Sequence, residues 1–399
     1  MMDDHATAAA GDLAPYWHDL VAWRRHLHQH PEISFQEHRT VAWLRETLEG
    51  RLRAASFENP TPTSLLVRFD TGRPGPRLGV RADIDGLAVQ EDRPDLEFAS
   101  VEQGRMHACG HDGHTAIVMA AAAWASDHLD ELDGEVWFIF QHAEETPPGG
   151  AKEMVEAVDF SGLDFIFGFH LWATLPLGTV DVKVGAASAN SDLFTITLTG
   201  RGAHASTPQD AVDPVVAAAQ VVSHVQSIVA RRVPPMQPAV VSTTWVEAGR
   251  QEALNVIPMT ARLGGSIRTH DESAREVIQS ALQEACDGLP AMHPGLHAEL
   301  DYLVGYDMVW NDPGRTAVVR QLAEALEGVS VVSEPPMLGG EDFAAFSRVA
   351  PSTYVFVGSG SEGFDSSHHS PTFALDERSF PIAWQLVVDV LRNRERFVG

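Results

Sequence analysis

Apolar runs of strand length alternate with helical segments through the first half of the chain, and this alternation constrains the fold more than any other feature. Strand-like runs occupy residues 64–69, 77–85, 135–145 and 163–172. Residues 114–129 have the spacing of a helix, and residues 15–50 read as two helices separated by a turn at His-Pro-Glu. Strands that alternate with helices are typical of an α/β layer built on a mixed, mostly parallel sheet.

The pattern changes from about residue 186. Strand, helix, strand, strand, helix and strand segments follow in turn at residues 191–202, 210–232, 239–249, 259–269, 272–289 and 296–304. This order is the split β-α-β arrangement of a ferredoxin-like α+β unit. The chain then returns to an α/β pattern. We therefore predict a first domain made of residues 1–185 and 306–399, and an inserted domain made of residues 186–305.

The net charge limits the partners of this chain. The sequence has 28 Lys and Arg against 55 Asp and Glu, which gives a formal net charge of −27. Nucleic acid and anionic membrane surfaces attract clustered positive charge, so we expect neither as a partner. The two cysteines, Cys109 and Cys286, allow no disulfide framework and favour a reducing compartment. The acidic start lacks a secretory signal, and the apolar stretch 116–125 is too short to span a bilayer, so we expect a cytoplasmic protein.

Polar side chains recur where the predicted strands of the first half end. They are Asp83, Asp85, Cys109, His111, Glu144, Glu145 and His170, and His368 and His369 lie near the C-terminus. Ligands of open α/β sheets bind at the carboxyl ends of the strands. Thiolate, imidazole and carboxylate are the groups that bind borderline divalent metals. Their recurrence at successive strand ends indicates a metal site.

Each residue also has a plainer interpretation. A lone His170 would be a hydrogen-bonded structural histidine, Glu144 and Glu145 a solvated strand end, and Cys109 a small buried side chain. Asp112 would cap the helix that follows it, with His114 inside that helix. We assign His26, His28 and His30 structural or surface roles, and Cys286 a place in the core. The coincidence of ligand types, rather than any single residue, favours the metal site.

Several motifs together resemble one family along residues 15 to 390. They are GVRADIDGLAVQE, MHACGHDGHTA, QHAEETPPGGAKEM, GFHLW, GRGAHAS, NVIP, GSIRT, GGEDFAAF and HHSPTFALDE. In order and spacing they are similar to the N-acyl-amino-acid amidohydrolases, which include hippurate hydrolases, auxin-conjugate hydrolases and N-acetyldiaminopimelate deacetylases, in the clan of aminoacylase and carboxypeptidase G. The resemblance implies a zinc-peptidase-like catalytic domain and an inserted lid or dimerisation domain.

The resemblance also implies a dinuclear metal centre. Its ligands would be Cys109, His111, Glu145, His170 and His369, with His368 as the fallback for the last. Glu144 matches the general base, and a hydroxide would bridge two divalent ions, for which Zn or Mn is favoured and Ni or Co is compatible. Other branches of the clan carry His-x-Asp where this chain reads Arg81-Ala82-Asp83. We therefore expect Cys109 to replace that histidine, and Asp83 and Asp112 to support the ligands.

The tandem glutamates need a bend in the chain, because neighbours in a regular strand point to opposite faces. The TPPGG that follows them is a candidate for that bend. In the inserted domain, the resemblance implies that His204 is an oxyanion donor supplied across a subunit interface. It also implies that Asn255 and Arg268 hold the carboxylate end of the substrate, and that Gly339 and Gly340 form a loop near the site. We expect a homodimer or homotetramer.

The sequence therefore predicts a metal-dependent amidohydrolase that cleaves N-acyl-L-amino acids, such as acyl or aroyl amino acids, into a carboxylic acid and an amino acid. A dipeptidase or an aminoacyl-glutamate carboxypeptidase would use the same centre and is an alternative. A relative that binds acyl-amino acids without cleaving them is a second alternative, but it would need no base such as Glu144. An acidic interaction scaffold would leave the ordered ligand set to chance.

Overall fold

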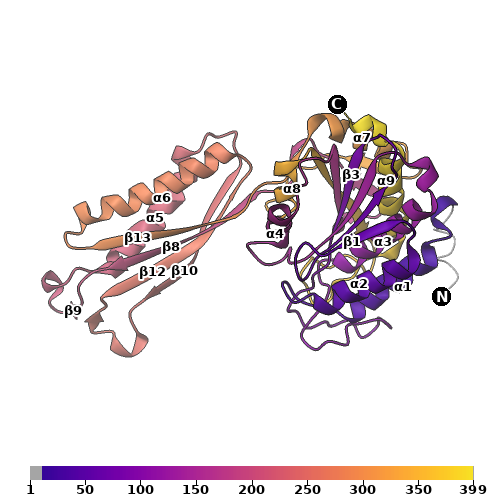
Figure 1. The fold of residues 1–399 in the computed structure, drawn as a ribbon. Helices are drawn as coiled ribbons and strands as arrows, with labels where there is room; N and C mark the ends of the chain where they lie inside the picture. The colour runs from indigo at the N-terminus through magenta and orange to yellow at the C-terminus, as the bar shows by residue number, and fades with distance from the viewer. Residues whose placement is uncertain (1–10, 399) are drawn as a thin grey trace. The chain divides into compact units, whose positions relative to one another are not determined.

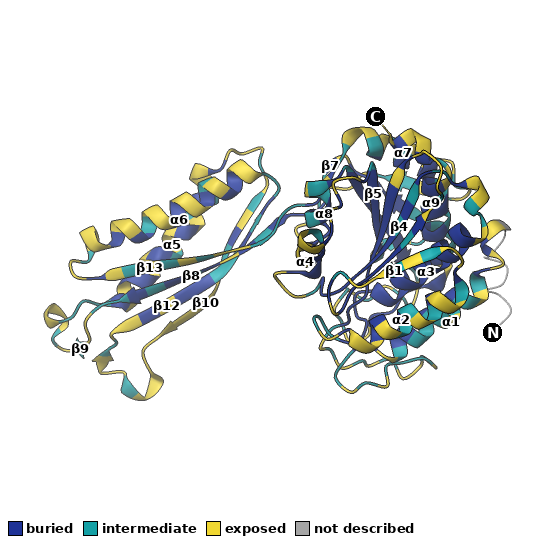
Figure 2. Cartoon of the chain, viewed as in Figure 1, coloured by how far each residue is buried: buried dark blue, intermediate teal, exposed yellow. Residues whose placement is uncertain are grey.

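The chain divides into two compact units in a computed structural model that describes residues 11–398. The first unit comprises residues up to Ala187 together with Val309–Pro335 and Asp342–Gly399, and the second comprises Ser188–Met308 and Pro336–Glu341. Each unit has its own cluster of buried apolar side chains, as Figure 2 shows. The N-terminal residues 1–10, where the absence of a secretory signal was expected, lie outside the described residues.

A mixed sheet forms the centre of the first unit. Within the described residues its eight strands lie in the order β1-β2-β4-β3-β5-β16-β6-β15. Their bounds are Ala55–Glu58 (β1), Leu65–Asp70 (β2), Arg77–Asp83 (β3), Glu135–Gln141 (β4), Phe165–Pro176 (β5), Thr179–Asp181 (β6), Ser330–Val332 (β15) and Ser352–Gly360 (β16). The central pairs β4-β3, β3-β5 and β5-β16 are parallel, as is β6-β15. The predicted α/β class with a mostly parallel sheet is confirmed.

Helices cover both faces of this sheet in Figure 1. They are Trp17–Gln29 (α1), His38–Arg51 (α2), His111–Asp127 (α3), Gly150–Ala157 (α4), Pro313–Glu324 (α7), Ala344–Val349 (α8) and Phe380–Arg392 (α9). The central strands β3 and β4 are buried along most of their length, as expected of parallel strands covered on both faces. Helix α3 is almost entirely buried because its alanines and branched side chains pack on strand β3 and on the helices α1 and α9.

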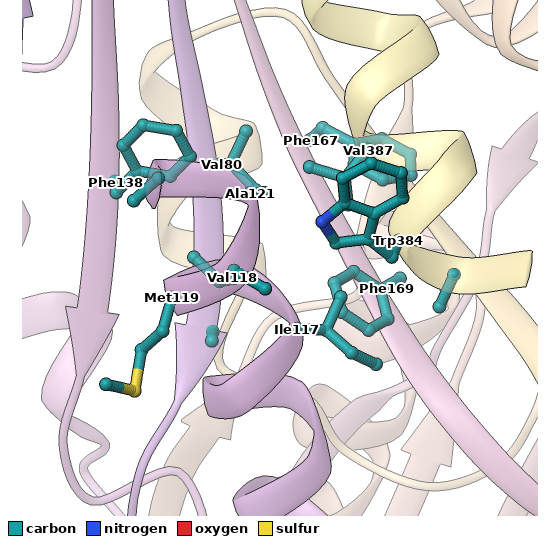
Figure 3. Close-up of a cluster of buried hydrophobic side chains, with 14 of the residues drawn as sticks. Val80, Ile117, Val118, Met119, Ala121, Phe138, Phe167, Phe169, Trp384 and Val387 are labelled. Atoms are coloured by element: carbon teal, nitrogen blue, oxygen red, sulfur yellow. The ribbon is translucent and has the colours of Figure 1, made fainter. Parts of the chain in front are cut away.

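Figure 3 shows this packing at the core of the first unit. Trp384 of α9 lies beside Phe167 and Phe169 of β5, and Ile117 of α3 lies close to the same group. These side chains are fully or almost fully buried. The tight packing matters for the site, since α3 begins at His111 and β5 passes through His170. Two of the predicted ligands are therefore carried on rigid elements.

The second unit is a four-stranded antiparallel sheet covered on one face by two helices. Its larger elements are Asn190–Thr199 (β8), Pro214–Arg232 (α5), Ala239–Ala248 (β10), Thr260–Thr269 (β12), Glu272–Met292 (α6) and His297–Tyr306 (β13). This is the predicted β-α-β-β-α-β order, and the strands lie in the order β10-β12-β8-β13. Alternate residues of β8, such as Phe194 and Ile196, are buried against the helices.

Short strands complete the chain. They are Gly185–Ala186 (β7) paired with Trp310–Asn311 (β14), and Ala203–His204 (β9) paired with Val256–Ile257 (β11). Among the described residues, none of the helices combines the length and the apolar character that crossing a bilayer requires.

Candidate metal centre

The turn before α3 positions Cys109 and His111. Gly110 lies between them at the N-cap of the helix with a φ of 96°, a left-handed conformation that glycine adopts readily. The helix begins at His111, three residues earlier than the sequence predicted. Asp112 therefore lies in the first turn, and the prediction that it caps the helix is wrong, because Gly110 holds that position and no side chain caps it.

Asp112 is instead part of a buried charge network. Its Oδ2 lies 2.9 Å from Arg24 Nε and 2.8 Å from His28 Nδ1, and all three side chains are buried. Burial alone would raise the pKa of Asp112, but Arg24 and His28 hold that pKa well below its usual range. Asp112 thus ties the first turn of α3 to α1. Its carboxylate contacts α1 side chains, so a supporting role toward the metals would act only through the helix.

The two histidines of the centre are oriented by backbone carbonyls. His111 Nδ1 lies 3.0 Å from the Asp85 carbonyl oxygen, and His170 Nδ1 lies 2.9 Å from the Leu171 carbonyl oxygen. Each Nδ1 N–H donates to one of these oxygens, so each ring offers Nε2 as the nitrogen that would bind a metal. Metal-binding histidines typically use their second nitrogen in this way.

Two groups of closely spaced ligand atoms are made wholly of the predicted metal ligands, and the two groups overlap. Cys109, His111 and His170 offer ligand atoms that all lie within 4.8 Å of one another, and so do Cys109, Glu145 and His369. Cys109 Sγ lies 3.5 Å from His170 Nε2, and His369 Nε2 lies 3.1 Å from Glu145 Oε1. The five side chains that the sequence singled out therefore converge, and Cys109 belongs to both groups.

The chemistry of this pocket fits a cation. His111 Nε2 is buried and makes no hydrogen bond, although Asp83, Glu145 and Glu144 place carboxylate oxygens 3.7, 3.8 and 3.9 Å from it. Burial alone would lower the pKa of His111, but Asp83, Asp85 and Glu145 together raise it to about 10. Burial, followed by the nearby glutamates, raises the pKa of the Cys109 thiol well above its usual range. A divalent ion would satisfy His111 Nε2 and stabilise the Cys109 thiolate.

Two further histidines border the group but already have partners. His114 Nδ1 lies 2.7 Å from Asp83 Oδ1, and His114 Nε2 accepts the Leu171 N–H at 2.9 Å. His368 Nε2 accepts the Ala173 N–H at 3.1 Å, so its Nδ1 carries the proton, 3.7 Å from Cys109 Sγ. Neither ring has a free lone pair for a metal. This favours His369 over the fallback His368.

The bend that the tandem glutamates need lies before them. Strand β4 ends at Gln141, and Ala143 follows with a φ of 50°, which is left-handed for a residue other than glycine. Glu144 and Glu145 then both lie within 4 Å of His111 Nε2. The TPPGG that follows the pair was the expected bend, but the strand alternation is already broken two residues after β4 ends.

Two residues beside the centre, Asp85 and Arg81, make contacts there that the sequence analysis did not assign to them. Asp85 Oδ1 lies 3.2 Å from His111 Nδ1, and Asp85 Oδ2 accepts the Glu145 N–H at 3.1 Å. Arg81, at the position where the clan's histidine is expected, forms ion pairs with Asp83 at 2.7 Å and Asp342 at 3.0 Å. Asp85 follows Asp83 at the same strand end, and that position was the one available sequence signal.

The remaining predicted residues belong to the second unit and fall at its two ends. His204 is exposed on β9, and the Ala205 N–H donates to the Asn255 carbonyl at 2.9 Å, so His204 and Asn255 are neighbours. Arg268 pairs in register with Ser191, and a Cβ on Gly340 would lie 2.9 Å from Ser191 Cβ. The length of β12 gives the separation of these two ends. From residue 260, where the strand begins, to residue 268 it covers about 26 Å, at a rise of roughly 3.3 Å per residue.

Comparisons with known proteins identify the family of the chain. Residues 79–393 match the peptidase family M20/M25/M40. The chain belongs to this family. It is 42% identical over 295 residues to an N-acyl-L-amino acid amidohydrolase of Geobacillus stearothermophilus, covering 73% of this chain and 78% of that protein. It is 38% identical over 371 residues to an N-acetylcysteine deacetylase of Bacillus subtilis, covering 93% of this chain and 95% of that protein.

A solved structure extends the comparison to the fold. The YXEP protein of Bacillus subtilis, described as a dinuclear metal-binding peptidase of the M20 family, superimposes with a TM-score of 0.80 at 34% identity, covering 94% of this chain and 99% of that one. Membership of the M20/M25/M40 family confirms the resemblance drawn from the motifs. It also confirms that the chain is an enzyme of the metallo-amidohydrolase and metallopeptidase class.

Proposed function

We propose that this M20-family enzyme hydrolyses the amide bond of N-acyl-L-amino acids at a dinuclear metal centre. The observation that carries the proposal is the convergence of two ligand groups on one thiol, Cys109, beside Glu144. The Geobacillus stearothermophilus and Bacillus subtilis relatives are named for the same reaction type on N-acylated amino acids.

The residues would hold two divalent ions in a shared cage. Cys109, His111 and His170 make up one group of residues that would hold an ion, and Cys109, Glu145 and His369 make up the other. When bound, the pair would polarise the amide carbonyl and lower the pKa of water towards roughly 7. A thiolate and imidazole set favours Zn, whereas the carboxylate admits Mn, and Ni or Co is compatible.

Glu144 would move the proton of the reaction. Its carboxylate would accept a proton from the attacking water and donate it to the leaving nitrogen of the amino acid. Such positioned proton transfer typically contributes about 10²–10⁴-fold to the rate. Two divalent ions against Cys109, Glu144 and Glu145 leave about one positive charge before Asp83 is counted. A substrate with a free carboxylate suits that charge.

The second unit would contribute residues to two different sites. His204 and Asn255 lie at one end of its sheet, and Arg268 and Gly340 lie near Ser191 at the other end. The two ends are too far apart for one small substrate. We therefore infer that Arg268 holds the substrate carboxylate through its planar fork, while His204 and Asn255 come from a second copy of the chain. A homodimer follows, or a homotetramer made of such dimers.

A substrate panel tests the reaction. N-acetyl, N-benzoyl and indoleacetyl amino acids are compared with dipeptides on protein reconstituted with Zn or Mn. Preferred cleavage of the N-acyl amino acids is expected, and preferred cleavage of dipeptides would favour the dipeptidase alternative. A protein that binds these compounds without cleaving any of them would contradict the proposal.

Replacing Glu144 distinguishes a general base from a metal ligand, because loss of a base lowers activity without lowering metal content. Glu144→Gln should keep its metal content and lose activity by about 10²–10⁴-fold. Glu153→Gln is the matched control, because Glu153 is half exposed on α4 and lies 3.1 Å from His142 Nε2. Near-normal activity of Glu144→Gln would remove the proposed base.

Subunit mixing tests the shared site. Neither His204→Ala nor Glu144→Gln protein should be active alone. Hybrid dimers pair an intact Glu144 on one chain with an intact His204 on the other, so a mixture refolded together should recover partial activity. No recovery from mixtures that demonstrably contain hybrids would place the whole site within one chain.

A further inference from the structure

The left-handed residue before the tandem glutamates, Ala143, is held by one side chain from a distant segment and by one backbone group that follows it in the chain. The Ala143 N–H donates to Glu37 Oε1 at 2.8 Å, and the Ala143 carbonyl accepts the Gly150 N–H at 3.1 Å. Glu37 lies at the start of α2, in the turn between α1 and α2, and is fully buried. A left-handed conformation is unfavourable for alanine and persists only where the surroundings hold it. Both peptide groups of Ala143 are held in this way.

The same carboxylate oxygen also holds its own loop. Glu37 Oε1 accepts the Phe35 N–H at 3.0 Å, and Phe35 has a φ of 65°. One oxygen atom therefore joins two left-handed residues that are more than a hundred positions apart. The Phe35 ring packs edge-on against the His142 ring with centroids 5.7 Å apart. The α1–α2 loop is docked on the bend by both polar and apolar contacts.

A second connection runs from this loop to the candidate ligands. Ser34 Oγ donates to Asp85 Oδ2 at 2.7 Å. Asp85 Oδ2 also accepts the Glu145 N–H, and Asp85 Oδ1 lies beside His111 Nδ1. Residues 34–37 thus support the backbone on both sides of Glu144, through Glu37 at Ala143 and through Ser34 and Asp85 at Glu145.

We propose that Glu37, assisted by Ser34, is a positioning residue that sets the bend on which Glu144 and Glu145 both face the metal centre. The inference rests on the proposed function where it treats Glu144 as the base. The orientation of Glu145 toward the candidate ligands does not depend on that function. Glu37 would contact neither metal nor substrate. It would act because a regular strand at Ala143 would turn one of the two glutamates away.

Three variants test the proposal. Glu37→Ala removes the acceptor for both N–H groups, whereas Glu37→Gln keeps an amide oxygen at the same place. Glu32→Ala is the matched control, since Glu32 is a buried glutamate of the same loop that accepts the Thr40 N–H at 2.8 Å and pairs with Arg39 Nε at 2.9 Å. A general loss of stability should affect Glu37→Ala and Glu32→Ala alike.

The readouts are kcat, KM and Zn affinity measured by competition with a chelator. Loss of an outer partner typically costs about 10–100-fold in metal affinity or activity. Glu37→Ala should therefore lose about 10–100-fold in kcat and in the affinity for the more weakly bound Zn, with little change in KM. Glu37→Gln should stay near wild type in both, and so should Glu32→Ala despite a lower melting temperature.

The Zn affinity distinguishes a failure of the proposed function from a failure of the proposed role of Glu37. If the wild type hydrolysed no N-acyl amino acid, the proposed function would fail, but the affinity difference between Glu37→Ala and Glu32→Ala would still report on the bend. If Glu37→Ala does not fold, Ser34→Ala takes its place, with a smaller fall in Zn affinity expected. The proposal would be overturned if Glu37→Ala and Glu32→Ala had equal kcat and equal Zn affinity. Where Ser34→Ala replaces Glu37→Ala, a wild-type Zn affinity of Ser34→Ala would overturn it.

Discussion

Replacing Arg81 with methionine should destabilise the first unit by a predictable amount. The Arg81 side chain is 1% exposed, and its guanidinium pairs with Asp83 at 2.7 Å and Asp342 at 3.0 Å and donates to Gln141 Oε1 at 2.7 Å. Methionine retains much of the stem of arginine but leaves two buried carboxylates without their cation. Removing one partner of a buried ion pair costs about 3–5 kcal/mol.

The number of residues in the first unit gives the change in melting temperature that corresponds to this loss of stability. Unfolding releases about 2.1 cal/mol/K of entropy per residue, so a unit of roughly 270 residues gains about 0.57 kcal/mol/K. A loss of about 3–5 kcal/mol then lowers the melting temperature of the first unit by about 5–9 °C. Differential scanning calorimetry at neutral pH measures this shift directly.

An exposed ion pair provides the control. Arg51 Nη1 lies 3.1 Å from Asp127 Oδ1, and both side chains are about one-third exposed. Pairs of this kind contribute at most about 1 kcal/mol, so Arg51→Met should lower the melting temperature by less than about 2 °C. The reasoning would be refuted if Arg81→Met melted within about 2 °C of the wild type, because the buried carboxylates would then not need the guanidinium.

Three further predictions use other features of the first unit. Cys109→Ala should lower the occupancy of both ions, whereas His369→Ala should lower that of one, because Cys109 alone belongs to both groups, and metal analysis after dialysis separates the two results. Burial, with Asp85, raises the pKa of Glu37 from an ordinary 4.5 to about 8. Between pH 4.5 and about pH 8, Glu37 is therefore protonated in the folded state of metal-free protein but ionised in the unfolded state. The free energy of unfolding should fall by about 1.4 kcal/mol for each unit by which the pH rises through this window. Denaturant titrations should show that Glu37→Gln loses this dependence, and an unchanged slope would contradict it. Gly113→Ala should cost about 1–3 kcal/mol by thermal unfolding, because its Cβ would lie 2.7 Å from Leu375 Cδ1, and an unchanged melting temperature would show that Leu375 moves aside freely.

The candidate site was visible in the sequence because most of the candidate ligands lie beside a strongly apolar run. His170 is carried on a buried strand, and Cys109 and His111 lie at the start of a buried helix, so local pattern and place in the fold agree there. The α/β class and the β-α-β-β-α-β order of the second unit were predictable for the same reason, since periodicity is a local property of the chain.

Other assignments depended on contacts between distant residues. Asp112 looked like a helix cap, but its carboxylate is used by Arg24 and His28 of a helix some 80 positions away. The bend at the tandem glutamates was expected in the TPPGG that follows them, and it is set at Ala143, whose N–H binds Glu37. A local pattern cannot show which distant partner will satisfy a buried donor or carboxylate.

The sequence by itself therefore determined which elements form and which ligand-type side chains end them, because hydrophobic periodicity and residue chemistry act within a few residues. Only the tertiary structure decided how those side chains are oriented. Asp85 orienting His111, Arg81 pairing with Asp342, and Glu37 holding the bend all depend on residues far apart in the sequence. Burial makes each of these contacts obligatory, since a charged or polar group removed from water must find its partner within the fold.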